Sequence, residues 1–296
     1  MLDPKRGAKL MAFARSGQRA RGVARIVHGL PATDGGGVRL TRVIGTQQLD
    51  SLDPFLLLDE LKSDRPGEYL AGFPAHPHRG FETVTYLMAG RMRHRDNQGH
   101  SGLVEAGGAA WMNAGRGIIH SEMPEQADGL LWGFQLWVNL PAAAKLVPAR
   151  WQDAAPQTVP TLELAPGAQL SLLAGSINGL SGPLSGLVTA TVLADLKLVP
   201  GAQVLLPLSS GLNAFAYVCA GSVEVLGAVR QAVAQQELAV LLDGEVLALA
   251  AGGAGARLFV AAASPLGEPI ARYGPFVMNT REELMQAVAD YQAGRF

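Results

Sequence analysis

Short apolar runs, separated by Gly, Pro, Asp and Asn, recur along the chain from about Gly22 onward. Three of these runs alternate with a period of two or are rich in β-branched and aromatic residues: Val38–Ile44, Thr83–Met88 and Leu130–Val138. A period of two is that of a strand with one buried face, and turns at this spacing are typical of sandwiches and barrels. Strand-like runs resume at Leu162 and continue to Ala263, so the pattern predicts an all-β fold.

One segment has the pattern of a helix, and it lies at the C-terminus. Thr280-Arg-Glu-Glu283 is a capping box, in which the Thr hydroxyl and the Glu carboxylate satisfy each other's free backbone N–H groups. Leu284, Val288 and Tyr291 follow as one apolar stripe, and Gly294 is a stop signal. The sequence therefore predicts a short C-terminal helix that packs on a barrel face.

A faint internal repeat relates the two halves of the chain. His76-Pro-His78 and the run Gly80–Gly90 align with Leu206-Pro-Leu208 and the run Gly211–Gly221. The offset is about 130 positions, and prolines and Ala-Gly turns match in the two copies. One β unit used twice predicts two tandem β-barrels.

The predicted organisation has four parts. Residues 1–21 form a basic flexible tail, residues 22–145 an N-terminal barrel with a metal site, residues 146–265 a C-terminal barrel without metal ligands, and residues 266–296 a C-terminal segment with the helix. The stretch Pro141–Pro160 is poor in strand signals and is the predicted linker.

Charge and cysteine content narrow the function classes. The 24 Lys and Arg balance 25 Asp and Glu, so the chain has no basic field for direct nucleic-acid binding. The one cysteine, Cys219, excludes an internal disulfide framework and a thiolate metal cluster and fits a cytoplasmic protein. No apolar stretch reaches the roughly 18 residues of a membrane helix, so no membrane partner is expected.

The histidines are the main chemical signal. Alternate residues of a strand point to the same face, so His76 and His78 are expected to project together. The same spacing pairs His120 with Glu122. Three imidazoles and a carboxylate suit Fe(II), and also Mn, Ni, Cu, Co or Zn, with coordination positions left open for substrate and O2. A single strand histidine is usually only hydrogen-bonded, but two such pairs in one domain favour a metal site.

The second half of the repeat lacks these ligands. At the same offset of about 130 positions, the four candidate ligands are replaced by Leu206, Leu208, Ala250 and Gly252. No histidine follows His120. The repeat therefore predicts one barrel that has a metal site and one that has lost it.

Three long motifs closely resemble the signature of the pirin family within the cupin superfamily: Gly72–Tyr86, His94-Arg-Asp96 and Trp111–Pro124. Further segments are similar to the same family: Asp53–Glu60, Gln135–Pro141 and Gly274–Thr280. The resemblance runs from about residue 22 to the C-terminus and implies a bicupin, a protein of two cupin barrels. It implies Fe(II) in the N-terminal barrel, held by the residues that match the family's ligands: His76, His78, His120 and Glu122.

Two further residues are assigned next to this ligand set. Glu82 stands where the general cupin motif has a carboxylate ligand, but the pirin pattern takes its carboxylate from Glu122. We therefore expect Glu82 to lie behind the ligands, where it can hydrogen-bond a ligand imidazole. His94 is either a second residue of this kind or a strand-end histidine paired with Asp96, and the pairing with Asp96 is the favoured interpretation.

The resemblance implies two classes of function. Some family members cleave quercetin, so the first hypothesis is a metal-dependent dioxygenase that acts on a flavonol with O2. In this hypothesis Glu122, as a ligand that shares its charge with metal and substrate, is the base that accepts the phenolic proton. The animal protein is a nuclear, iron-dependent transcriptional co-regulator, so the alternative is a non-catalytic, iron-binding redox sensor that docks on a protein partner. A bicupin with no metal is the third and least favoured hypothesis.

Overall fold

A computed structural model describes residues 17–189 and 191–296, and these residues form two compact units. The histidine unit comprises residues 30–159, 184–189 and 265–296. The apolar unit comprises the described residues of 17–29, 160–183 and 191–264. The predicted all-β fold of two tandem barrels with a short C-terminal helix is confirmed. The predicted tail within residues 1–16 lies outside the described residues.

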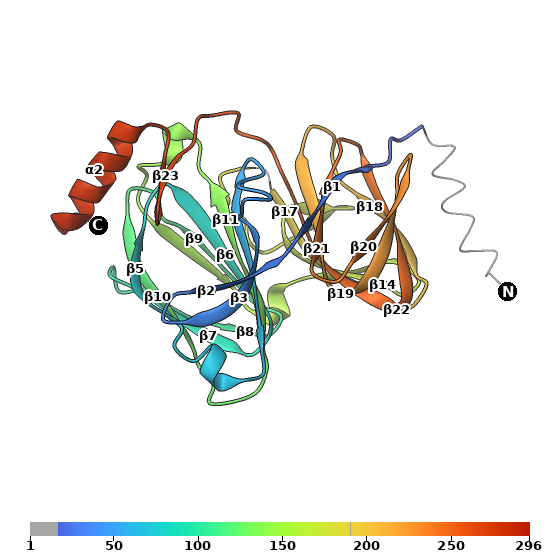
Figure 1. The fold of residues 1–296 in the computed structure, drawn as a ribbon, viewed down its shortest axis with the longest axis horizontal. Helices are drawn as coiled ribbons and strands as arrows, with labels where there is room; N and C mark the ends of the chain where they lie inside the picture. The colour runs from blue at the N-terminus through green and yellow to red at the C-terminus, as the bar shows by residue number, and fades with distance from the viewer. Residues whose placement is uncertain (1–16, 190) are drawn as a thin grey trace. The chain divides into compact units, whose positions relative to one another are not determined.

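The histidine unit is built from a seven-stranded sheet and a four-stranded sheet (Figure 1). The seven-stranded sheet has the order β12 (Arg150–Ala154), β9 (Ala109–Asn113), β6 (Phe81–Ala89), β11 (Leu131–Asn139), β4 (Phe55–Ser63), β3 (Val38–Ile44) and β2 (Leu30–Asp34). The four-stranded sheet has the order β5 (Phe73–His78), β10 (Ile118–Pro124), β7 (Arg91–Asp96) and β8 (Ser101–Glu105).

The C-terminal segment completes the histidine unit. Strands β23 (Ala271–Tyr273) and β24 (Phe276–Met278) form a hairpin, and helix α2 (Arg281–Gln292) lies beside it (Figure 1). The predicted capping box at Thr280 and Glu283 is present, because the two side chains accept from each other's backbone N–H groups. The buried residue of the helix is Ala287, which lies between Leu284 and Val288 of the predicted apolar stripe.

The apolar unit has one nine-stranded sheet. Its main path is β1 (Val23–His28), β21 (Glu237–Leu241), β19 (Asn213–Leu226), β22 (Val246–Ala263), β17 (Thr191–Leu198), β14 (Ala168–Ala174) and β13 (Thr161–Ala165). Strand β18 (Gln203–Pro207) pairs with β22, β20 (Arg230–Ala234) pairs with β19, and a small separate pair is formed by β15 (Ser176–Ile177) and β16 (Leu180–Ser181).

Two strands pair differently from the predicted boundaries. Strand β1 pairs with β21 and so belongs to the apolar unit, although the prediction placed it in the N-terminal barrel. Strand β12 lies in the predicted linker and pairs with β9 of the histidine unit. Local sequence predicts that a strand forms, but its partner strand depends on contacts between residues far apart in the sequence. The spacing of apolar residues does not show these contacts.

Arg21 corrects the prediction that the flexible tail extends to residue 21. Its side chain is fully buried and donates to the carbonyl oxygens of Ser209, Leu212 and Leu242. Arg19 also binds the same unit through an ion pair with Asp243 at 2.5 Å. Buried carbonyl groups need donors, and the guanidinium supplies several from one side chain.

The core of the apolar unit shows what replaces the histidines of the repeat. In the histidine unit, His76 pairs with His120 across β5 and β10. In the apolar unit, Leu206 pairs with Leu247 across β18 and β22, so Leu247 is the counterpart of His120. The predicted counterpart, Ala250, is wrong by three positions, because Ala250 pairs with Gln203 instead.

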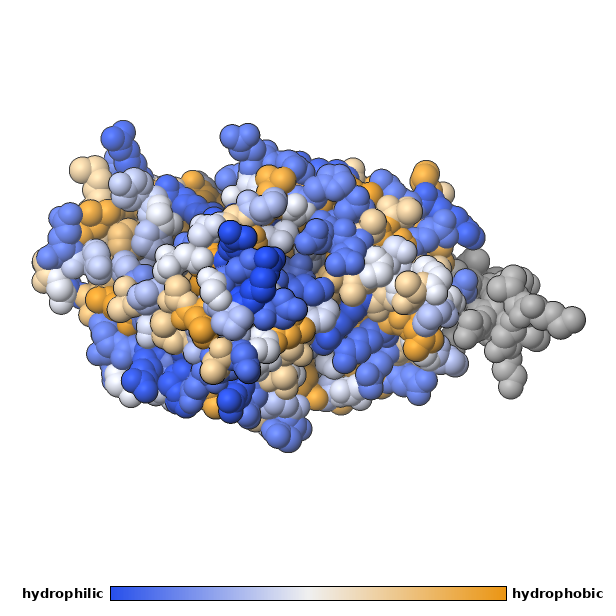
Figure 2. All heavy atoms as spheres, turned by 60° about the horizontal axis from the view of Figure 1, so that its bottom comes forward, coloured by the Kyte–Doolittle hydropathy of each residue, from blue (hydrophilic) through white to orange (hydrophobic). Residues whose placement is uncertain are grey.

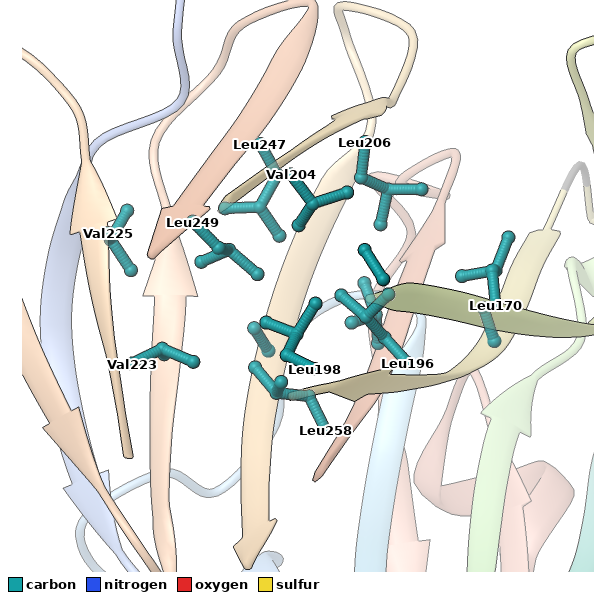
Figure 3. Close-up of a cluster of buried hydrophobic side chains, with 14 of the residues drawn as sticks. Leu170, Leu196, Leu198, Val204, Leu206, Val223, Val225, Leu247, Leu249 and Leu258 are labelled. Atoms are coloured by element: carbon teal, nitrogen blue, oxygen red, sulfur yellow. The ribbon is translucent and has the colours of Figure 1, made fainter. Parts of the chain in front are cut away.

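The apolar replacements pack on one another. Leu206, Leu247 and Leu249 are fully buried and lie in one cluster with Val204 and further aliphatic side chains (Figure 3). The side chains at the positions of the ligands therefore fill this core with hydrocarbon instead of imidazole.

Two further observations concern the surface. On the face drawn in Figure 2, apolar residues are dispersed among polar ones, which is normal for a protein surface. Within the described ranges, no helix has the length and apolar character needed to cross a membrane.

Candidate metal centre

Strand pairing brings three of the predicted ligands together. His76 and His120 are direct partners across β5 and β10, and His78 follows His76 on the same face. The ring centroid of His76 lies 4.6 Å from that of His78 and 4.4 Å from that of His120. The centroids of His78 and His120 are 4.9 Å apart. One ring nitrogen from each histidine falls in a group that lies within 4.8 Å. This is a three-histidine cluster of the kind that holds a divalent metal.

The hydrogen bonds of the cluster leave nitrogen lone pairs available. The ring contact between His76 Nδ1 and the carbonyl oxygen of Pro74, at 2.7 Å, places the proton on Nδ1, because a carbonyl can only accept. His76 Nε2 then has a free lone pair, and it lies 3.0 Å from His78 Nε2. A carbonyl that fixes the tautomer of a ligand histidine in this way is typical of metal sites.

Burial keeps the remaining imidazoles neutral. Desolvation, together with the neighbouring His76, holds the pKa of His78 well below its usual range. Desolvation and then His78 and His76 do the same to the pKa of His120. Both ring nitrogens of His120 are buried and have no hydrogen-bond partner among the described residues. Neutral imidazoles with unpaired nitrogens fit a bound divalent ion, which needs such lone pairs.

Glu122 lies in the wall of the same site but outside the three-histidine group. The register shift between β10 and β5 places the extra residue on β5, whereas β10 pairs with β7 in continuous register from His120 to Pro124. His120 and Glu122 therefore point to the same face of β10, as their spacing predicts. One carboxylate oxygen accepts from Thr85 Oγ1 at 2.5 Å, and the other accepts from Gln135 Nε2 at 2.6 Å. Two neighbouring strands thus fix the orientation of the carboxylate.

The site opens into a cavity of about 550 Å³. Its wall includes His76, His78 and Glu122, together with apolar side chains and two arginines. The apolar and aromatic part of the wall is formed by Leu57, Leu61, Phe73, Trp137 and Pro275. A cavity of this size and lining fits a small aromatic molecule, since sites for drug-sized ligands have about 300–1,000 Å³.

Glu82 faces away from the three imidazoles. Phe81 of the same strand packs on His78 and Thr85 binds Glu122, so the odd-numbered residues of β6 face the site. Glu82 therefore points to the opposite side of the sheet. Its carboxylate accepts from Trp111 Nε1, Asn113 Nδ2 and the backbone N–H of Val188, and among the described residues it bonds to none of the three imidazoles.

The expected hydrogen bond, in which Glu82 accepts from a ligand imidazole, is thus absent among the described residues, because Glu82 lies on the other side of β6. The sequence does not show which side of a strand faces the site. Burial raises the pKa of Glu82 to about 8, with the three donors opposing that shift. Gly186 makes this packing possible, because a Cβ at that position would lie 2.4 Å from the Trp111 ring.

His94 lies close to the site but is paired differently from the prediction. Its Nε2 atom lies 2.9 Å from Asp153 on β12, not beside Asp96. Its ring stacks on Trp151 with a centroid distance of 4.4 Å, and the same indole lies 5.7 Å from the ring of His120. Asp96 instead accepts from Trp151 and lies 2.9 Å from His100 Nδ1. The prediction failed here because β12 was read as a linker.

Several residues of the site were not identified from the sequence. Thr85 and Gln135 orient Glu122, and Arg42, Asp59 and Arg272 line the cavity. Gln135 is the polar residue within the apolar run 130–138, and a polar side chain in such a run indicates a functional position. Arg272 carries no such signal, because its strand joins this unit only through long-range packing.

Comparison with known proteins gives a consistent result along most of the chain. Residues 37–138 match the family described as Pirin, and residues 193–296 match the family described as Pirin C-terminal cupin domain. A putative quercetin 2,3-dioxygenase of Pseudomonas aeruginosa is 49% identical over 280 residues, which cover 93% of this chain and 98% of the relative. Pirin of Homo sapiens is 40% identical over 266 residues, which cover 88% of each chain.

A solved structure agrees with these relatives. The crystal structure of quercetin 2,3-dioxygenase from Acinetobacter baumannii superimposes with a TM-score of 0.86 at 31% sequence identity. The match covers 94% of this chain and 98% of that protein.

Proposed function

The chain belongs to the pirin family, and on this premise we propose that it is a metal-dependent dioxygenase that cleaves a flavonol such as quercetin with O2. The observation that carries the proposal is the cluster of three imidazoles, two of which line a cavity sized for a small aromatic molecule. Similarity to proteins named as quercetin 2,3-dioxygenases supports the choice of substrate class. We also propose a cytoplasmic location, which the single cysteine favours.

His76, His78 and His120 would hold the metal, with Glu122 as the candidate fourth ligand. Imidazole with one carboxylate suits Fe(II), which we propose as the ion, and such a set also accepts Mn, Ni, Cu, Co or Zn. When bound, the ion supplies Lewis-acid and redox chemistry to the substrate oxygens and O2.

The protein's own contribution is positioning and proton transfer. The apolar walls around Phe73 and Trp137 hold a planar substrate and exclude water. Among the carboxylates of the wall, Asp34 and Asp59 are paired with Arg42, and Glu122 is the one that we assign as the base. It accepts the proton of the reacting hydroxyl group, which becomes an enolate while the carboxylate becomes the acid. Thr85 and Gln135 hold this carboxylate in one orientation, which keeps the accepting oxygen in place.

The test compares metal content and oxygen uptake for the wild type and Glu122→Gln. Elemental analysis after loading with each divalent ion is expected to find metal in both proteins. Oxygen uptake with quercetin is expected to fall at least about 100-fold in Glu122→Gln, the scale of a lost general base. Glu105→Gln, at an exposed glutamate on β8, is the matched control and is expected to keep wild-type turnover.

Two outcomes would contradict the proposal. Unchanged oxygen uptake in Glu122→Gln would remove Glu122 as the base. Stable quercetin absorbance under air, with full metal occupancy of the wild type, would remove the dioxygenase and leave the regulatory alternative.

A further inference from the structure

Arg272 is a charged residue of the cavity wall that the proposed chemistry does not use. It lies on β23 of the C-terminal segment and lines the same cavity as His76 and His78. Its Nη1 atom donates to the carbonyl oxygen of Leu56 at 3.1 Å, and its guanidinium carbon lies 5.1 Å from the centroid of the Trp137 ring. The side chain is therefore held in a fixed place at the cavity.

The two arginines of the cavity differ in how their charge is balanced. Arg42 makes two hydrogen bonds to the carboxylate of Asp59, at 2.9 and 2.7 Å, and a third to Asp34 at 2.7 Å. Arg272 has no carboxylate within 4.0 Å among residues 17–189 and 191–296. Within the described part of the chain, one of its five N–H donors bonds to the protein, so the others are available to a ligand.

The surroundings of Arg272 favour an anion. The residue keeps exposed surface, yet partial desolvation lowers the pKa of its guanidinium. The charges of Asp50 and Asp59 oppose this shift, and that of Arg42 adds to it. A partly desolvated cation without a bonded counter-charge is stabilised when an anion binds to it. Because a guanidinium presents a planar fork of donors, it suits oxygen anions such as carboxylates and phenolates.

Arg272 and the histidine cluster are a short distance apart. Trp137 contacts both, since its ring centroid is 5.1 Å from the His78 ring and 5.1 Å from the Arg272 guanidinium carbon. One indole therefore contacts both the cation and a candidate metal ligand. A ligand of two fused or linked rings can contact the imidazoles with one end and Arg272 with the other.

We propose that Arg272 binds an ionised oxygen of the aromatic ligand, a phenolate or a carboxylate remote from the end that faces the histidines. The proposal rests on the proposed function only in taking the ligand to be a small aromatic molecule. Arg272 is thus a specificity-determining residue, because it discriminates between ligands that carry this anion and neutral analogues.

The test measures binding to the full chain after treatment with a chelator, so that turnover does not interfere. The ligand pairs are 4-hydroxycinnamate with its primary amide, and quercetin with its 7-methyl ether at pH 8. The first pair probes a carboxylate and the second a phenolate. In at least one pair, the wild type is expected to bind the ionised member about tenfold more tightly, as for a charge-assisted hydrogen bond.

Variants of Arg272 connect this preference to one side chain. Arg272→Gln is expected to bind both members of the pair equally, and Arg272→Lys to keep part of the preference, because it keeps the charge without the planar fork. Arg39→Gln is the matched control, since Arg39 is an exposed arginine of the same unit that bonds to Glu68. It is expected to keep the wild-type preference.

Any of three results would overturn the proposal: equal affinity of the wild type for both members of both pairs, a preference that survives in Arg272→Gln, or no binding of any ligand at millimolar concentration. A wild-type protein that shows no preference but turns over quercetin would refute this proposal alone. An intact preference without turnover would refute only the dioxygenase.

Discussion

Buried imidazoles are costly side chains, and the two units show the contrast at single positions. His120 has two buried nitrogens without partners among the described residues, whereas its counterpart Leu247 is packed in hydrocarbon. An unpaired buried polar group costs about 1–3 kcal/mol. The histidine cluster therefore destabilises the metal-free folded protein, and a bound metal ion would remove this cost.

We expect His120→Leu to stabilise the metal-free protein by about 1 kcal/mol, because it replaces unpaired nitrogens with an apolar side chain of similar volume. The same substitution removes a ligand, so added metal should no longer raise the melting temperature. Thermal unfolding with chelator and with each metal measures both effects. His28→Leu, at an exposed histidine of the apolar unit, is the control and should leave both values unchanged. A metal-free His120→Leu protein that is less stable than the wild type would contradict the argument.

Glu82 gives a prediction about pH. Its pKa is raised from 4.5 to about 8, so between these values the folded state keeps a proton that the unfolded state releases. The free energy of unfolding should then decrease as pH rises through this window, by at most about 1.4 kcal/mol per pH unit from this group. Glu82→Gln removes the titration and should flatten the slope. Urea unfolding at pH 5, 6.5 and 8 measures the difference between the two proteins.

Other groups, including His78 and His120, also contribute to the pH dependence because burial lowers their pKa in the folded state, but they are common to both proteins and cancel in the difference. Parallel pH profiles for the wild type and Glu82→Gln would show that Glu82 is ionised in the folded state. The three donors around its carboxylate would then outweigh desolvation.

How far single residues could be predicted depended on whether local spacing was enough. The i, i+2 spacing of His76 and His78 was sufficient to place them on one face, and the structure brings both to His120. The side of the sheet on which Glu82 lies required the phase of β6. The partner of His94 required knowing that β12 pairs with β9.

Among the strands and segments, the C-terminal hairpin β23–β24 depends on a buried lysine. Lys145 is nearly inaccessible and donates to the carbonyl oxygens of Gly80 and Val277 and to Asn139 Oδ1, at 2.7–3.0 Å. Burial lowers its pKa to about 8. One ammonium thus joins the start of β6, the end of β11 and β24.

Lys145→Met should leave these three acceptors unpaired and destabilise the protein by about 3 kcal/mol, the scale of breaking a buried charged network. The loss should be local at first, so that proteases cut near residues 265–280 at lower concentration than in the wild type. Chemical unfolding and limited proteolysis with mass spectrometry measure the two effects. Lys197→Met, at an exposed lysine, serves as the control. Unchanged proteolysis in Lys145→Met would mean that the hairpin is held by its apolar contacts.

The internal repeat was easier to recognise than to align. The segments around His76 and Leu206 match at the predicted offset. For the strand that carries His120 the offset differs, because the equivalent residue on β22 is Leu247. Insertions between strands change the offset without changing the fold, and hydrogen-bond register is the property that defines equivalence.

Across the whole chain, the all-β class, the two barrels and the family followed from the sequence, but the path between the units did not. Strand β1 precedes the histidine unit in sequence and pairs within the apolar unit, and residues 265–296 follow the apolar unit and pack in the histidine unit. Neither crossing leaves a local signal, because both segments have the composition of ordinary strands and turns.

This path predicts that removing the C-terminus damages the unit that lies far from it in sequence. Residues 265–296 contribute Val277 to an apolar cluster with Leu56 and Phe81, and Asp290 to a 2.7 Å ion pair with Arg79. In a chain that ends at Ser264, residues 30–159 should lose these contacts and the candidate metal centre should no longer bind metal. The nine-stranded sheet of the apolar unit should persist, because none of its strands is removed. Hydrogen exchange resolved by segment, together with metal titration, distinguishes the two units. Equal protection of residues 30–159 in the full and shortened chains would contradict this dependence, whereas collapse of both units would show that they unfold together.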